Sequence, residues 1–173
     1  MYRHRIGLAF ALVALLALTA SAQRDAGAKA RGDFSFYARS GYSHVNAAHD
    51  HASHYEDYLG DSASVSPRVV RMSGSTIGHH LDLTQQNVDA MREHFVAQDD
   101  AESIATLDTI DDHLADARKH HATAQALAAG SPADPAQARK SVQSLQDSLE
   151  QVRDLQQSIL DRHDVTLQPA PAE

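Results

Sequence analysis

The chain has 173 residues, of which 42% are hydrophobic and 5% aromatic, with no cysteine and a formal net charge of −8. Without cysteine it cannot form disulfides, thiolate metal sites, iron–sulfur clusters or a cysteine nucleophile. The net negative charge argues against nucleic-acid binding, which needs a positively charged surface. The small number of aromatic residues disfavours a many-stranded β fold. The sequence contains 12 histidines, an unusual number that directs attention to metal binding.

Residues 1–22 have the pattern of a secretory signal peptide. Two arginines precede an almost wholly apolar run over residues 6–18, and Ala20-Ser21-Ala22 supplies the small residues of a cleavage site. The apolar run is shorter than the about 20 residues that a membrane span needs. We therefore expect cleavage after Ala22, a periplasmic or secreted mature protein, and no stable membrane span after cleavage.

The next segments differ in polarity and periodicity. Residues 23–35 are polar, mix charges and contain two glycines, which is typical of a flexible lead-in. Residues 36–164 divide into four amphipathic patterns. The first runs from Phe36 to Leu59 with apolar residues at spacings of three and four, as on one face of a helix, and Gly60 follows it. Residues 165–173, with two prolines, are expected to form a disordered tail.

The other three patterns begin and end at recognisable signals. The second begins at Ser66-Pro67 and the fourth at Asp134-Pro135, each a capping residue followed by proline at the first helical position. The third follows Asp99-Asp100, whose carboxylates favour a helix N-terminus, and stops at Gly130. No segment alternates long enough to predict a convincing strand. Because the connections are short, we predict an all-α fold, an up-down-up-down antiparallel four-helix bundle.

The histidines fall at three heights along such a bundle, each supplied by at least two helices. The candidate metal ligands that share this property are His44, His51, His54, His80, His94, His113, His120, His121 and His163. The level nearest the turn between the first and second helices contains His51, His54, His120 and His121. The next level contains His44, His79, His80 and His113, and the far end contains His94 and His163. His49 and His79 are expected on the solvated surface.

Imidazole nitrogen is a preferred ligand of Cu²⁺, Zn²⁺ and Ni²⁺, and bundle interiors commonly hold such sites. Two or three histidines at one level, with aspartate or water, suffice to complete a coordination shell. We expect copper(II) or zinc, with nickel as the third choice. A structural alternative stays open at several positions: His94 and His163 could be hydrogen-bonded residues at the bundle end, and His54, His113 and His120 could be exposed partners of nearby acids.

Motifs of known enzymes and oxygen carriers are absent. The sequence has no Glu-x-x-His of di-iron bundles, no His-Glu-x-x-His, no P-loop and no Gly-x-Ser-x-Gly, so we expect no enzymatic activity. In general plan the chain resembles exported helical proteins that buffer or sense copper, zinc or nickel. The resemblance lies in architecture and histidine content alone and assigns no residue a role.

Three functional hypotheses follow. The first is an exported, histidine-rich bundle that binds several divalent transition-metal ions for buffering, storage or resistance. The second is a pH-responsive periplasmic adaptor or chaperone, whose clustered imidazoles become charged near pH 6 and loosen the bundle. The third and weaker one is a b-type haem protein with Met91 and His163 as axial ligands. Alanine-rich stripes would also accommodate a homodimer.

Overall fold

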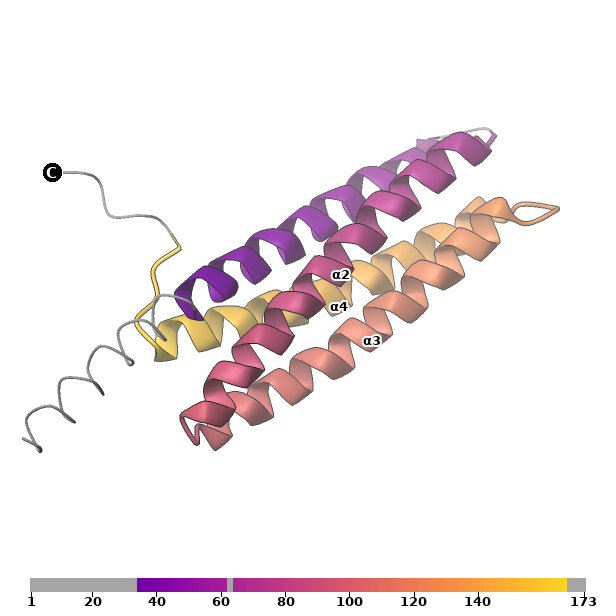
Figure 1. Ribbon diagram of the computed structural model, residues 1–173. Coiled ribbons are helices and arrows are strands. Elements are labelled where there is room, and N and C mark those ends of the chain that lie inside the picture. Colours follow the sequence, from indigo (N-terminus) through magenta and orange to yellow (C-terminus); the bar gives the residue numbers. More distant parts are fainter. Residues whose placement is uncertain (1–33, 62–63, 168–173) are drawn as a thin grey trace, which may run out of the picture. The chain divides into compact units, whose positions relative to one another are not determined.

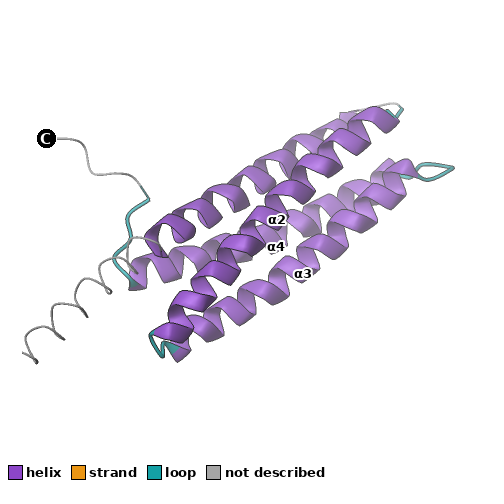
Figure 2. Cartoon of the chain, viewed as in Figure 1, coloured by secondary structure: helices purple, strands orange, loops and turns teal. Residues whose placement is uncertain are grey.

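The computed structural model describes residues 34–61 and 64–167. Over these residues the chain forms four helices and no strand (Figures 1 and 2), which confirms the predicted all-α class. The first helix is described over residues 34–61, and it is followed by α2 (Pro67–Ala97), α3 (Ala101–Ala129) and α4 (Pro135–Arg162). The predicted signal peptide, nearly all of the predicted lead-in and residues 168–173 of the predicted tail lie outside the described residues.

The helix starts follow the capping signals of the sequence. The Asp100 side chain accepts a hydrogen bond from the Ser103 backbone N–H at 3.0 Å, and Asp134 does the same for Gln137 at 3.0 Å. Such caps satisfy amide groups that have no partner within the helix. At the start of α2, Ser66 occupies the N-cap position without a side-chain cap; its own N–H donates instead to the Tyr58 hydroxyl at 2.6 Å.

The core is built from the apolar stripe of each helix. Val45 and Ala52 from the first helix, Ile77 from α2, Leu107 from α3 and Leu145 from α4 are all fully buried. Burying a side chain the size of valine or leucine contributes about 1.5–3 kcal/mol relative to leaving it exposed. Summed over these stripes, packing against neighbouring helices, rather than helix propensity, holds the four elements together.

Polar contacts between the helices show which positions lie at the same height. Arg92 of α2 pairs with Asp108 and Asp111 of α3 at 2.5 and 2.6 Å, and further along the same two helices Arg118 pairs with Asp82 at 3.0 Å. In these pairs the higher-numbered residue of α2, Arg92, contacts the lower-numbered residues of α3. These contacts show which positions of α2 and α3 lie at the same height.

Within the described ranges no helix is long and apolar enough to cross a membrane.

Candidate metal centre

Two imidazoles meet between the first helix and α2. The Nδ1 atoms of His44 and His80 lie 3.3 Å apart, with their ring centroids 5.5 Å apart. Both side chains are half-buried. At this distance one ring donates its Nδ1 hydrogen to the other, and the tautomers decide which of the two donates. The contact joins two of the predicted ligands that were expected at the same height.

A third imidazole lies against the pair. The His51 ring stacks on the His80 ring at a centroid distance of 5.5 Å and an interplanar angle of 16°. His51 follows His44 by seven residues on the same helix, so His80 lies between two rings that are about two turns apart. The sequence placed His51 nearer the turn, with His54, but the structure places it beside His80.

His79 also lies near this group, with its ring 5.6 Å from that of His80 and tilted by 52°. It is exposed, as expected from the sequence. Because His79 and His80 are adjacent on α2, their side chains leave the helix in different directions. We refer below to His44, His51 and His80 as the histidine cluster.

Burial and charge repulsion both favour the neutral forms of His44 and His80. Burial lowers the pKa of His44, and the nearby His79 lowers it further. Burial likewise lowers the pKa of His80, with additional repulsion from His44, His51 and His79. A neutral imidazole retains the lone pair that a metal ion requires, whereas a protonated one cannot bind. The lowered pKa values of His44 and His80 therefore favour the neutral state, in which imidazole can coordinate a cation.

His121 of α3 is held against two glycines of α2. It forms a hydrogen bond with the Gly74 backbone, which raises the pKa of His121, but burial has the larger effect and lowers it. Its Nε2 is buried and has no hydrogen-bond partner among the described residues. Its Cε1 lies 3.6 Å from the position that a Cβ at Gly78 would occupy. The contact orients the ring but ties it to α2 backbone rather than to the histidine cluster.

His163 joins the end of α4 to the start of α3. Its Nε2 lies 3.0 Å from the Ser103 hydroxyl and 3.3 Å from the Asp100 carboxylate, and its ring stacks on Phe95 at 4.9 Å. Ser, His and Asp are together here without forming a catalytic triad, because both oxygens approach the same ring nitrogen and Ser103 is fully buried. This geometry favours the structural alternative for His163 over a metal-ligand role. Sequence reasoning placed the Asp100 carboxylate at the start of α3 but did not predict its contact with His163.

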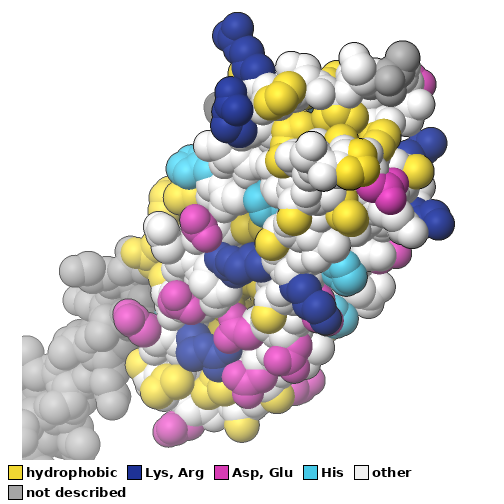
Figure 3. Space-filling view, turned by 90° about the vertical axis from the view of Figure 1, so that its right-hand side faces the viewer, with side chains coloured by type: hydrophobic (Ala, Val, Ile, Leu, Met, Phe, Trp, Pro, Cys, Tyr) yellow, Lys and Arg dark blue, Asp and Glu magenta, His cyan; other side chains and the backbone are white. Residues whose placement is uncertain are grey.

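The remaining predicted ligands are placed apart from the cluster. His94 is partly exposed, and its ring packs edge-on against its neighbour Phe95 at 5.5 Å. His113 and His120 are half-buried on α3, and His54 is exposed on the first helix. Figure 3 accordingly shows histidine side chains at separate places on one face of the molecule.

Three ligands are not preassembled at any one point. Across residues 34–61 and 64–167, no group of three or more His, Asp or Glu side chains is arranged to hold a metal ion. The structure therefore supplies two nitrogens at a fixed separation, with a third ring stacked beside them. A third ligand from the chain would require that ring to turn.

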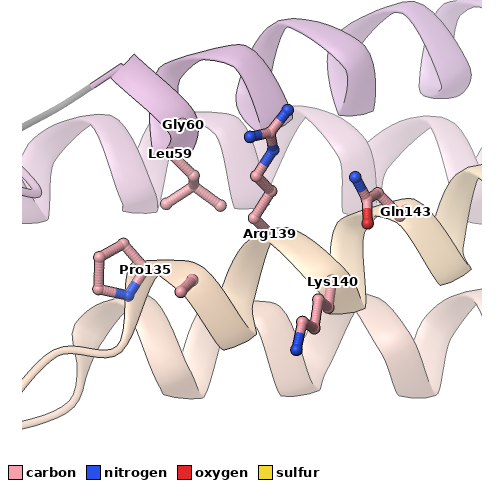
Figure 4. Close-up of a pocket in the computed structure, with 7 residues that line it drawn as sticks. Leu59, Gly60, Pro135, Arg139, Lys140 and Gln143 are labelled. Carbon is pink, nitrogen blue, oxygen red and sulfur yellow. The ribbon is translucent and has the colours of Figure 1, made fainter.

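A pocket of about 570 Å³ lies away from the histidines, between the end of the first helix and the start of α4 (Figure 4). Its lining residues are Leu59, Gly60, Pro135, Ala136, Arg139, Lys140 and Gln143. The Arg139 side chain extends toward the first helix, where its Nε donates to Glu56 at 3.1 Å. Gly60 allows this approach, because a Cβ there would lie 3.1 Å from the Arg139 guanidinium. The pocket is open and its main cation is already paired, so we assign it no ligand.

Comparisons with known proteins add no assignment, since no family model, no curated protein and no solved structure matches the chain.

Proposed function

We propose that the protein is an exported, non-enzymatic four-helix bundle that binds divalent transition-metal ions for buffering, storage or resistance. The proposed ions are Cu²⁺ or Zn²⁺, with Ni²⁺ as the third choice. The observation that carries the proposal is the 3.3 Å separation of two imidazole nitrogens from different helices, His44 and His80. The other predicted histidines are secondary sites at most in this proposal.

The separation of these nitrogens suits coordination to one ion. Imidazole nitrogens bind zinc at about 2.0–2.1 Å, so two nitrogens on one tetrahedral ion lie about 3.3–3.4 Å apart. His44 and His80 already stand at 3.3 Å. The ring centroids lie 5.5 Å apart, so the two nitrogens face each other almost head-on, and both rings turn before their lone pairs meet at one ion.

The proposed topology is up-down-up-down and antiparallel. Its support is the opposite run of residue numbers in the α2–α3 pairs Arg92–Asp108 and Arg118–Asp82. The proposed export depends on the signal-like pattern of residues 1–22 in the sequence.

Titration of the tag-free protein with Cu²⁺ and Zn²⁺ in a calorimeter tests the proposal. We expect at least about one equivalent bound at micromolar affinity, that is about −8 kcal/mol. His80→Gln and His44→Gln should each weaken binding, and His49→Gln on the same helix as His44 is the matched control. Binding of less than about one equivalent, or equal effects in all three variants, would contradict it.

The pH-responsive adaptor remains a competing hypothesis for the same cluster. Protonation of closely spaced imidazoles would make them repel, and the spacing of His44 and His80 is compatible with this. The two functions differ in one measurement. A ligand that binds the native state must raise the melting temperature, so acid-induced opening combined with no metal effect on melting would favour the adaptor.

The haem alternative receives little support from the geometry, because Ser103 and Asp100 already contact the Nε2 of His163. Failure of the pure protein to develop a Soret band on addition of haem would exclude it.

A further inference from the structure

We propose that the exposed face of α2 binds the same face of a second copy of the chain, with the two α2 helices antiparallel about a two-fold axis. This proposal goes beyond metal binding and does not depend on it. It concerns the side of α2 (Pro67–Ala97) that points away from the bundle core.

The exposed face of α2 consists of two neighbouring lines of residues, each with a spacing of seven. All of its members are exposed: Arg68, Ser75, Asp82, Asp89 and Val96 on one line, and Met72, His79, Gln86 and Glu93 on the other. A spacing of seven keeps a line on one side of a bundled helix, and two such lines form the seam along which helices pair. We refer to these two lines as the outer seam.

Charge is segregated along this face in a way that is unfavourable within a single helix. Arg68 and Arg71 are three residues apart near the start of α2, and Asp89 and Glu93 are four residues apart near its end. Like charges at these spacings repel each other. The first turn of α2 also holds Arg68 and no acid, although the helix dipole favours an acid there. None of the four side chains forms an ion pair with another described residue.

A second α2 in the antiparallel orientation removes this conflict. It brings the basic start of each helix to the acidic end of the other, so that each pair of like charges gains opposite charges across the contact. A partner that offers the same surface forms an isologous contact, which closes on itself as a dimer. Charge complementarity of the face with itself is therefore what identifies the partner as a second copy.

The exposed apolar side chains of α2 fit the same arrangement. Met72 is 59% exposed and Val96 is 58% exposed. When the two-fold axis lies at the level of Thr84, near the middle of α2, Met72 of each copy is level with Val96 of the other. The other facing positions of the outer seam are then Ser75 with Glu93, His79 with Asp89, and Asp82 with Gln86. No two of these facing residues carry the same charge.

The dimensions of the outer seam predict a weak dimer. A helix of 31 residues is about 45 Å long, and paired helix axes lie about 8–10 Å apart. Such a strip belongs with the small interfaces, those below about 1,200 Å², which form transient complexes. We therefore expect a dissociation constant on the order of 10–100 µM for the dimer.

Sedimentation equilibrium of the tag-free protein, with two charge-reversal variants, tests the pairing. The acidic variant carries Arg68→Glu with Arg71→Glu, and the basic variant carries Asp89→Lys with Glu93→Lys. Each variant alone should dimerise at least about tenfold more weakly than the parent, because like charges then face each other at both ends. An equimolar mixture of the two should dimerise again, because each variant supplies the charges that the other lacks.

Two control variants change the net charge equally on other helices. Lys119→Glu with Lys140→Glu matches the acidic variant, and Asp112→Lys with Asp116→Lys matches the basic variant, since all four residues are exposed on α3 or α4. Both controls should dimerise like the parent. Circular dichroism checks that every variant keeps its helices.

Cross-linking tests the antiparallel register, and the chain contains no cysteine that would interfere. A Met72→Cys variant mixed with a Val96→Cys variant should give a disulfide-linked dimer when oxidised with diamide. Neither variant should cross-link by itself, because identical positions lie about 36 Å apart in the proposed pair.

Three results would overturn the proposal. The first is a parent protein that stays monomeric at a concentration of about 1 mM, far above the expected dissociation constant. The second is a dimer that the control variants weaken as much as the charge-reversal variants, or one that the mixture fails to restore. The third is efficient cross-linking of Met72→Cys alone, which would show that the helices are parallel or that another face pairs.

Discussion

Replacing Gln156 of α4 by leucine should stabilise the protein. Gln156 is 2% exposed, and neither its amide nitrogen nor its amide oxygen has a hydrogen-bond partner among the described residues. The residue continues the heptad line of Val142 and Leu149, which are buried apolar positions. Its amide therefore lies in the interior without the partners that buried polar groups normally have.

The expected gain follows from the missing hydrogen bonds. A buried polar group without a partner costs about 1–3 kcal/mol. Leucine removes both amide groups and has a similar volume. The tight contact with the first helix limits the gain, because a Cβ at Gly41 would lie 3.1 Å from the Gln156 amide nitrogen. We therefore expect Gln156→Leu to raise the free energy of unfolding by about 2 kcal/mol.

Urea denaturation followed by circular dichroism measures this change, through a higher midpoint at an unchanged slope. Gln151→Leu is the matched control, because Gln151 is exposed on the same helix, and it should change stability by less than about 0.5 kcal/mol. A Gln156→Leu variant that is less stable than the parent would refute the reasoning, since it would mean that the amide contributes favourably to the native state.

Three other predictions follow from the described contacts. Gly78→Ala should stabilise the protein by up to about 1 kcal/mol in urea denaturation, because alanine favours the helix and its Cβ would meet only His121 Cε1, at an ordinary 3.6 Å; a loss of stability would show that the ring cannot accept the methyl group. The Ser103 hydroxyl and backbone N–H hold the pKa of Asp100 below its usual value of 3.8. This carboxylate therefore contributes stability above about pH 4, and the contribution is lost as the pH falls through the lowered value. Urea denaturation from pH 7 to pH 2 should show the advantage of the parent over Asp100→Asn shrinking in acid, and a constant difference would contradict this assignment. Zn²⁺ should raise the melting temperature of the parent more than that of His80→Gln, and equal shifts would place the ion elsewhere.

The helices could be predicted from the sequence because their determinants are local. Apolar spacing of three and four, the caps at Asp100 and Asp134, and the prolines after the caps each act within one or two turns. The structure confirms the all-α class, and the predicted stripes are buried almost throughout. Ile104, which the spacing of three and four places on the apolar stripe of α3, is an exception: it is only half-buried, because it lies in the first turn, where fewer neighbours cover it.

The candidate site could be predicted only in part. Counting a rise of about 1.5 Å per residue along each helix placed His44 and His80 at the same height, and these two rings do meet. It separated His51 from them, although imidazoles two turns apart on one helix can both reach a ring that lies between them. The site also needed side-chain directions, and a rise of 1.5 Å per residue does not specify these.

The sequence by itself determined the number and extent of the helices, the face that each one buries and the concentration of histidines on them, since these follow from periodicity along one chain segment. Only the tertiary structure decided which residues the histidines contact. In the structure His44 contacts His80, His121 contacts the α2 backbone at Gly74, and His163 at the end of α4 contacts Ser103 of α3. The physical reason is that a contact between helices depends on their relative height and rotation, which the packing of all core side chains sets together.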